Sequence, residues 1–176
     1  MQPSRFALII VATSMTTSVV AMQQQTTNKN AAHEQSDFGA DLEEPDRPAA
    51  VPDEVVQKIR EVRKAAPEEL PTEWLVASEI HLDGPNEIDL IVVGTGGLRG
   101  AHIVPFWVFR KKQAGYEMVL ATGGDGLSVL KTRWKGFREI NALGIGLAGQ
   151  EITTTTFRFD GQRYQKFKTK TESNNS

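Results

Sequence analysis

A short basic stretch in the C-terminal half holds the residues best suited to binding an anionic ligand. Between Lys131 and Arg138, cationic side chains surround Trp134. A cation beside an aromatic ring can hold a sugar ring by stacking and an anionic group by charge. The same stretch could instead form an ordinary hairpin with a buried tryptophan. The residues predicted to bind ligand are Lys131, Arg133, Trp134, Lys135, Arg138 and, from a preceding glycine-rich turn, Asp125.

Alternation along a strand separates these side chains into two groups. It places Lys131, Arg133 and Lys135 on one face. Trp134 then points the other way, or is exposed at the turn before Gly136. The sequence does not decide between these two positions of the tryptophan.

Carboxylates near predicted turns offer a second kind of chemistry, hydrolysis. Two carboxylates can cleave a glycosidic bond when their separation is suitable, but a sequence cannot place them. Calcium usually needs several carboxylates in a short span, and Asp125 stands alone in its turn, so no metal site is predicted. The histidines show no zinc-ligand spacing either. The carboxylates considered for hydrolysis are Asp83, Asp89, Asp125 and Glu139.

The glycine-rich segment Gly94–Gly100 superficially suggests a nucleotide-binding loop. Such a loop needs a helix immediately afterwards, so that the helix N-terminus meets the phosphates. Here Ile103–Phe109 follows, which is aromatic and β-branched and contains Pro105. We therefore expect an inter-strand loop and predict no cofactor.

Composition narrows the chemistry further. The chain has 176 residues and no cysteine, which excludes disulfides, thiolate metal sites and a cysteine nucleophile. The formal net charge is −2, but acids cluster between Glu34 and Glu54 and bases between Lys131 and Lys170. A basic face could meet an anionic envelope polymer, lipid head groups or an acidic protein. It could equally be a solvated sheet face, partly neutralised by the acidic segment.

Residues 1–21 are typical of a cleavable export signal. Arg5 is followed by the apolar run Phe6–Ala12 and by small residues up to Ala21. The alternative is a membrane anchor, although the run is short for a bilayer core of roughly 30 Å. The sequence thus predicts a periplasmic or secreted protein with no nucleic-acid partner and no membrane insertion after signal removal.

The remaining chain is predicted to form one α+β domain at residues 51–170. Residues 22–50 are polar and acidic and are predicted to form a disordered linker. A short tail at residues 171–176 is also predicted to be disordered. Pro52–Ala66 carries an apolar stripe at helical spacing. From Trp74 onward the period is two, with glycine, asparagine and aspartate turns between strands. The predicted strands are Trp74–Leu82, Glu87–Val93, Val104–Lys111, Tyr116–Ala121, Leu127–Arg133, Phe137–Leu143, Glu151–Phe159 and Arg163–Lys168.

Together these patterns predict one N-terminal helix packed on a twisted, mainly antiparallel β-meander. The turn of the last hairpin is assigned to Asp160-Gly161. The helix stripe needs a partner, and we expect the sheet to supply it.

Parts of this domain resemble a group of uncharacterised exported bacterial β-rich domains. The resemblance covers about Trp74 to Lys168 and is carried by Pro105–Arg110, Gly115–Glu117, Gly136–Ile140 and Phe159–Tyr164. The group implies an exported location but no established activity. Leu82–Val92 also resembles an FG-GAP repeat, whose aspartate-rich loop binds calcium, but most of those aspartates are missing here.

The sequence therefore predicts a non-catalytic exported protein that binds a protein or an anionic envelope glycan. The expected surface is the basic strand region with the loop at Gly123–Gly126. The alternative is a small exported hydrolase that uses the turn carboxylates. The oligomeric state and the ligand stay open.

Overall fold

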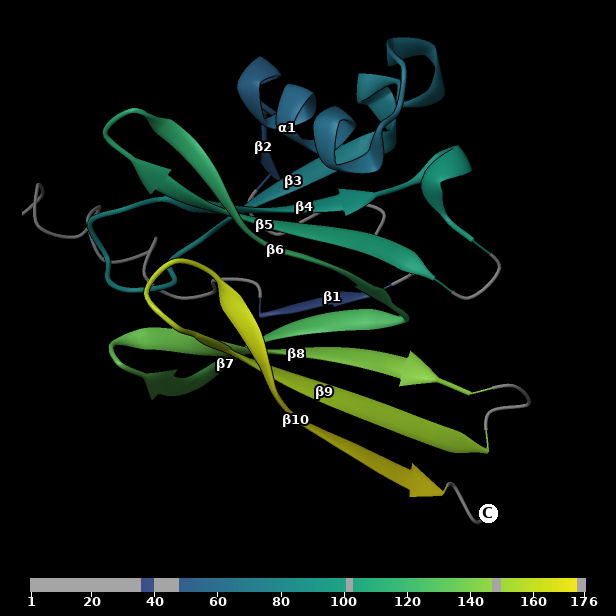
Figure 1. Ribbon diagram of the computed structural model, residues 1–176, viewed down its shortest axis with the longest axis vertical. Coiled ribbons are helices and arrows are strands. Elements are labelled where there is room, and N and C mark those ends of the chain that lie inside the picture. The colour runs from purple at the N-terminus through teal and green to yellow at the C-terminus, as the bar shows by residue number, and fades with distance from the viewer. Residues whose placement is uncertain (1–35, 40–47, 101–102, 147–149, 174–176) are drawn as a thin grey trace, which may run out of the picture. The chain divides into compact units, whose positions relative to one another are not determined.

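Two five-stranded antiparallel sheets carry most of the described chain (Figure 1). The structure is a computed structural model and describes residues 36–39, 48–100, 103–146 and 150–173, all within one compact unit. The first sheet has the order β2-β3-β4-β5-β6 and the second the order β1-β7-β8-β9-β10. We call them the β2–β6 sheet and the β7–β10 sheet.

The strands of the β2–β6 sheet are β2 Pro48–Ala49, β3 Leu75–Ile80, β4 Asp89–Gly94, β5 Val104–Lys112 and β6 Gly115–Gly124. Those of the β7–β10 sheet are β1 Asp37–Gly39, β7 Gly126–Trp134, β8 Phe137–Ile145, β9 Glu151–Phe159 and β10 Tyr164–Ser173.

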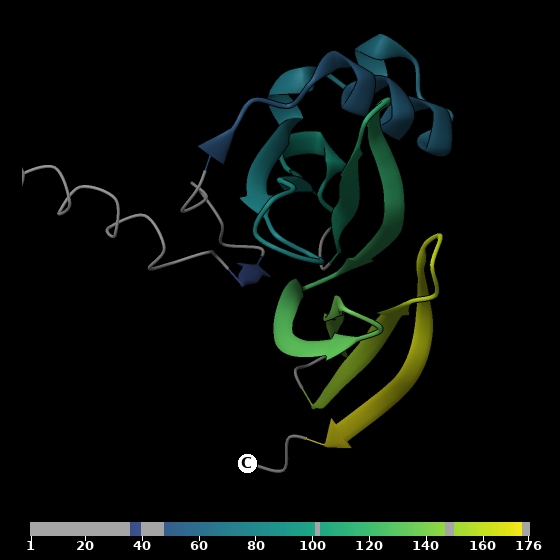
Figure 2. The ribbon, with the colours of Figure 1, turned by 90° about the vertical axis from the view of Figure 1, so that its left-hand side faces the viewer.

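The main core lies between the two sheets. Ile91 and Phe106 of the β2–β6 sheet belong to one buried cluster with Leu127, Ile140 and Phe159 of the other sheet. Because successive side chains of a strand point to opposite faces, each sheet contributes only alternate residues to this cluster. The two sheets consequently share a single apolar layer. Figure 2 shows the β2–β6 sheet above and the β7–β10 sheet below.

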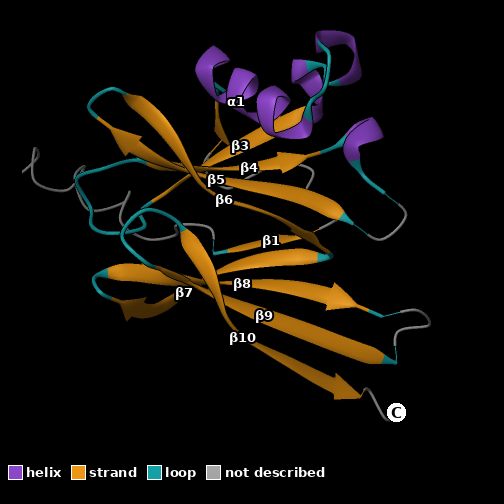
Figure 3. Ribbon diagram, in the orientation of Figure 1, coloured by secondary structure: helices purple, strands orange, loops and turns teal. Residues whose placement is uncertain are grey.

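A second core lies on the other face of the β2–β6 sheet, beneath helix α1 (Asp53–Arg63). Val55, Val56 and Ile59 of the helix are buried against Trp107 and other residues of that sheet. Figure 3 shows the helical segments gathered on this side. The central strands β4 and β5 are therefore buried on both faces, which explains their continuous apolar sequences.

The predicted arrangement of one N-terminal helix on one meander is wrong in two respects. Helix α1 begins at Asp53, after strands β1 and β2, and short 3-10 helices also occur among the described residues at Pro67–Glu69, Thr72–Trp74 and Gly96–Leu98. The strands also divide into two sheets, because the chain passes from β6 in one sheet to β7 in the other around Asp125. The prediction of a mainly antiparallel, β-rich fold is confirmed.

Two segments within the predicted linker are strands in the structure. Phe38 of β1 lies opposite Leu127 and is buried in the main core, and β2 pairs with β3. Strand β10 likewise extends through Ser173, into the predicted tail. The predicted signal at 1–21 and the rest of the linker lie outside the described residues. Within the described chain, no helix has both the length and the apolar character to cross a bilayer.

Candidate functional site

The predicted basic stretch forms the β7–β8 hairpin. Its turn is Lys135-Gly136, where the φ angles are 50° and 87°. Two consecutive positive φ angles define the tight turn whose twist matches that of the flanking strands. Glycine takes this conformation without strain, whereas Lys135 does so at some cost.

The two arginines of this stretch are engaged by the protein itself. Arg138 is 8% exposed, and its guanidinium donates hydrogen bonds to the carbonyls of Leu130 and Val129, both at 2.8 Å. Arg133 Nη1 donates to the carbonyl of Leu82 at 3.2 Å and to that of Gly136 at 2.6 Å. These arginines therefore fasten the hairpin to itself and to the loop after β3.

Trp134 points away from Arg133 and forms a surface cluster with residues of β8, β9 and β10. Its ring centre lies 4.5 Å from the guanidinium carbon of Arg158, and the ring centre of Phe167 lies 3.4 Å from the same carbon. Trp134 is 42% exposed and Phe167 is 51% exposed. We call Trp134, Arg158, Phe167 and Glu139 the aromatic–cation cluster.

Glu139 holds the central cation of this cluster. Arg158 Nε donates to Glu139 Oε1 at 2.5 Å. A hydrogen bond from the Thr132 hydroxyl and then the bond from Arg158 lower the pKa of Glu139. The carboxylate thus stays ionised, fixes the guanidinium and neutralises it, and leaves the two rings partly open to solvent.

Register places this cluster on the outer face of the β7–β10 sheet. Arg158 pairs with Gln165, while the adjacent pair, Phe159 and Tyr164, belongs to the core. Neighbouring residues of a strand point to opposite faces, so Arg158 faces away from the core. Lys168 pairs with Thr156, which precedes Arg158 by two residues, and therefore also faces outward. The exposed lysines of β7, of the turn after it and of β10 are Lys131, Lys135, Lys166, Lys168 and Lys170.

Asp125 lies far from this surface. It stands just before β7, whereas Trp134 ends that strand, so the two are separated by the strand length of roughly 25 Å. Asp125 Oδ2 accepts the N–H of Ile145 at 2.6 Å, and its own N–H donates to Leu143 at 2.8 Å. Of the residues predicted to bind ligand, Trp134 therefore belongs to the aromatic–cation cluster, Lys131 and Lys135 are exposed on the same hairpin, and Asp125 lies at the other end of β7, where it holds the passage between the sheets.

The carboxylates considered for hydrolysis all have partners inside the protein. Asp83 pairs with Arg110 at 2.5 Å, and Glu139 with Arg158. Asp89 is 0% exposed and accepts the N–H groups of Leu82 and Lys111 at 3.0 and 2.8 Å. Burial raises the pKa of Asp89 to about 6. Asp89 therefore has no access to an external substrate.

Sequence reasoning missed Arg158 and Phe167 as members of the candidate site. A two-residue turn at Asp160-Gly161 would place Arg158 opposite Arg163. The loop instead spans residues 160–163, so that Phe159 pairs with Tyr164 and Arg158 with Gln165. Phe167 lies at a register shift between Lys166 and Lys168. Such a shift cannot be read from alternation, so the two aromatic rings could not be placed together in advance.

No cluster of three potential metal ligands occurs among the residues that the structure describes. Comparison with protein-family models found no match, and comparisons with curated proteins and with solved structures found no significant similarity. The resemblance to exported bacterial domains stays a prediction.

Proposed function

We propose that this protein is a non-catalytic exported binding protein that engages an anionic envelope glycan. The binding surface is the outer face of the β7–β10 sheet around the aromatic–cation cluster. The observation that carries the proposal is the pair of exposed rings, Trp134 and Phe167, flanking one guanidinium among exposed lysines.

The cluster favours a sugar polymer because its rings are held in place before a ligand binds. Arg158 is fixed by Glu139 and contacts both rings, so little side-chain freedom is lost when a sugar stacks on them. The lysines on β10 and in the β7–β8 turn then supply positive charge for carboxylate or phosphate groups on the polymer.

A binding experiment with defined polymers tests the proposal. We expect isothermal titration calorimetry to detect binding of polygalacturonate, a uronic-acid polymer, and none of neutral dextran. Trp134→Ala and Phe167→Ala should each weaken binding about tenfold, the loss expected for about 1.4 kcal/mol of stacking. Affinity should also fall steeply with added salt, because exposed charges are screened.

A matched control is Ile145→Ala, which removes an exposed apolar side chain at the far end of β8. This variant should bind polygalacturonate as the parent protein does. Equal binding by Trp134→Ala and the parent, or binding that salt does not weaken, would contradict the proposal.

The exported location is a separate part of the proposal and rests on residues 1–21. Mass spectrometry of protein isolated from the cell envelope should find a mature N-terminus near Met22. An intact Met1 on protein purified from the cytosol would remove this part of the proposal.

A further inference from the structure

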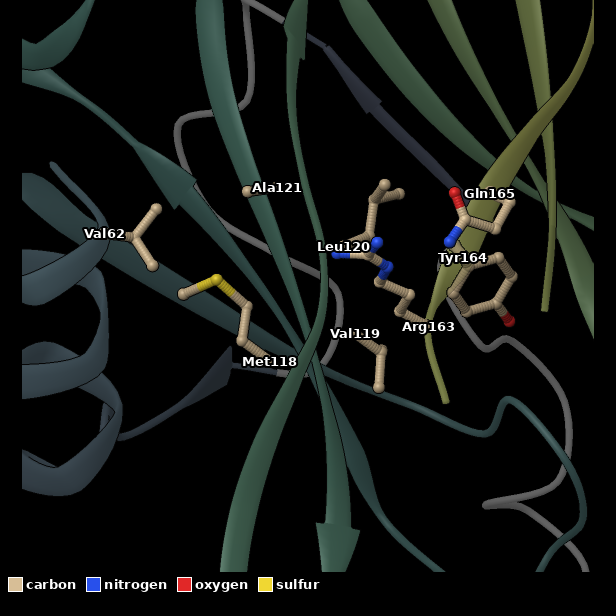
Figure 4. A pocket seen from close by; sticks show the side chains of 8 residues that line it. All are labelled: Val62, Met118, Val119, Leu120, Ala121, Arg163, Tyr164 and Gln165. Carbon is tan, nitrogen blue, oxygen red and sulfur yellow. The ribbon is translucent and has the colours of Figure 1, made fainter. Parts of the chain in front are cut away.

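Strand β6 is the last strand of the β2–β6 sheet, and one of its edges is open. A groove of about 430 Å³ runs along Met118–Ala121 of this edge. Figure 4 shows Val62 of helix α1 on one side of β6, and Arg163, Tyr164 and Gln165 of the β9–β10 hairpin on the other. The groove therefore lies where a further strand of the sheet would lie.

Helix α1 closes the beginning of this edge. The N–H of Tyr116 donates to Glu54 Oε2 at 3.3 Å, and Lys58 Nζ donates to the carbonyl of Tyr116. Both backbone groups of Tyr116 therefore point away from β5. Because this direction alternates along an antiparallel strand, the groups of Met118, two residues later, also point to the open edge.

Pro105 gives independent evidence for the direction of the β6 backbone groups that follow the register shift at Val108/Phe109. Pro105 of β5 pairs with Gly123, and proline has no N–H to donate. This pair therefore cannot exchange two hydrogen bonds, and the backbone groups of Gly123 point to the edge. Alternation assigns Ala121 to the edge as well. Among the described residues, no hydrogen bond from outside the sheet reaches Met118, Ala121 or Gly123.

The long edge strands of the two sheets, β6 and β10, differ in charge. Strand β10, the edge of the other sheet, carries lysines at three alternate positions along its exposed length. Charged side chains on an edge strand oppose pairing with another chain. From Met118 to Gly124, strand β6 carries no charged residue. Of these two edge strands, β6 is therefore the one suited to accept a further strand.

The walls of the groove specify side chains for that strand. On the helix side lie Val62, which is 57% exposed, Met118 and the exposed Ala121, an apolar surface. On the other side lie Arg163 and Gln165, and the Arg163 guanidinium forms no hydrogen bond or ion pair within the described chain. The nearby Asp160 carboxylate is engaged by the N–H groups of Gln162 and Arg163 and by the Gln165 side chain.

We propose that the β6 edge binds an extended segment of a partner protein whose side chains alternate between apolar and acidic residues. Main-chain hydrogen bonds to Met118, Ala121 and Gly123 supply affinity. Apolar side chains of the segment pack on Val62 and Met118, and the intervening carboxylates face Arg163. This site is separate from the glycan surface on the β7–β10 sheet.

Synthetic peptides test the proposal. The probe is an acetylated, amidated octapeptide, Ser-Val-Glu-Val-Glu-Val-Glu-Ser, titrated into the full chain by calorimetry and by NMR of labelled β6 amides. We expect saturable binding that shifts the amides of Met118, Ala121 and Gly123. N-methylation of one alternate set of peptide amides should abolish binding, while N-methylation of the other set should change it less than twofold, because only one peptide edge faces β6.

Protein variants separate backbone pairing from charge recognition. Arg163→Glu should weaken binding of the glutamate peptide at least tenfold and create binding of the peptide with lysine in place of glutamate. Ala121→Pro removes one edge N–H and should weaken binding of both peptides at least tenfold. Lys170→Glu, on the β10 edge, is the matched control and should leave the affinity unchanged.

Four outcomes would overturn the proposal: no binding, equal affinity for the glutamate and lysine peptides, equal effects of the two N-methylated sets, or unchanged affinity of Arg163→Glu. Concentration-dependent dimerisation that Ala121→Pro abolishes would overturn it too, since the edge would then bind a second copy. Trp134→Ala should keep peptide binding, and Arg163→Glu should keep polygalacturonate binding, so each site can fail without the other.

Discussion

At the scale of single residues, Asp89 shows how burial changes the pKa of a carboxyl group. It begins strand β4, directly before the apolar residues Leu90–Val93, and it is removed from solvent. Two backbone N–H groups stabilise its charged form, but burial has the larger effect and raises its pKa to about 6. Asp89 thus links the loop after β3 to strand β5. The free-energy cost of burying its charged form depends on pH.

This cost predicts how stability changes with pH. The folded-state pKa of Asp89 lies above the unfolded value, so its contribution is complete below about pH 4 and is lost as the pH rises through about 6. The shift of about two units corresponds to about 3 kcal/mol of unfolding free energy. Asp89→Asn does not titrate, so the stability advantage of the parent protein over this variant should shrink by about 2–3 kcal/mol between pH 4 and pH 7.

Urea denaturation at several pH values measures this difference. Asp160→Asn is a control of opposite sign, because backbone hydrogen bonds lower the pKa of Asp160 to about 2. The advantage of the parent protein over Asp160→Asn is present above the unfolded pKa and lost as the pH falls toward 2. A gap between parent and Asp89→Asn that is the same at every pH would refute the assignment.

In the basic stretch, the sequence shows which residues are cationic or aromatic, but not which groups each of them contacts. Trp134 was predicted either to face away from Lys131, Arg133 and Lys135 or to be exposed at the turn; it is half-exposed, and its ring lies against Arg158. Arg133, in contrast, bonds the carbonyl of Leu82, which lies 51 residues earlier. Whether a guanidinium is free for a ligand depends on such distant carbonyls, and the local pattern contains no information about them.

At the scale of elements, the C-terminal end of helix α1 depends on the conformation of one residue, Lys64. Lys64 follows the helix with φ 54°, and the N–H of Ala65 donates to the carbonyl of Arg60 at 3.0 Å. This left-handed ending usually employs glycine, since other residues bring Cβ close to the carbonyl. The helix therefore ends with the usual backbone hydrogen bond, but Lys64 is strained in the left-handed conformation.

Replacement of this residue should stabilise the protein. We expect Lys64→Gly to raise the free energy of unfolding by about 1 kcal/mol, because the left-handed conformation then carries no side-chain penalty. Gln57→Gly, on the exposed face inside the same helix, should lower it by about 1 kcal/mol. Thermal and urea denaturation give both values, and a loss of stability in Lys64→Gly would contradict this reading.

Strand positions follow the alternation of the sequence closely, with differences at the ends. Strand β9 coincides with the predicted Glu151–Phe159, whereas β3 begins at Leu75 because Trp74 ends a 3-10 helix. The Trp74 ring lies against Gly96 and Gly97, where a Cβ atom would collide with it. The glycines of the supposed nucleotide loop thus make room for a tryptophan, a packing reason that no local pattern reveals.

At the scale of the whole molecule, the passage from β6 to β7 determines the architecture. Gly124 lies so close to β8 that a Cβ atom on it would be 2.3 Å from the carbonyl oxygen of Leu143. The next residue, Asp125, bonds Leu143 and Ile145 of the same strand. The corner between the sheets is therefore packed backbone against backbone.

Any side chain at this corner should separate the sheets. We expect Gly124→Ala to lower the free energy of unfolding by at least about 2 kcal/mol, since backbone rather than a flexible side chain would have to move. Gly84→Ala is the control, because a Cβ atom there meets no atom within 4 Å, and it should be nearly neutral. Both variants should unfold in one cooperative step, as expected for sheets that share one core, and a neutral Gly124→Ala would refute this account.

The sequence by itself determined the β-rich class, the positions of most strands, the residues of helix α1 and the basic character of the C-terminal hairpins. Each of these depends on periodicity within about ten neighbouring residues, which local backbone geometry imposes. Only the tertiary structure decided that the strands divide into two sheets, that Arg133 and Arg138 bond carbonyls while Trp134 meets Phe167, and that β6 leaves an open edge. These features depend on contacts between segments far apart in the chain, where burial and the supply of hydrogen-bond partners are set by the packed molecule.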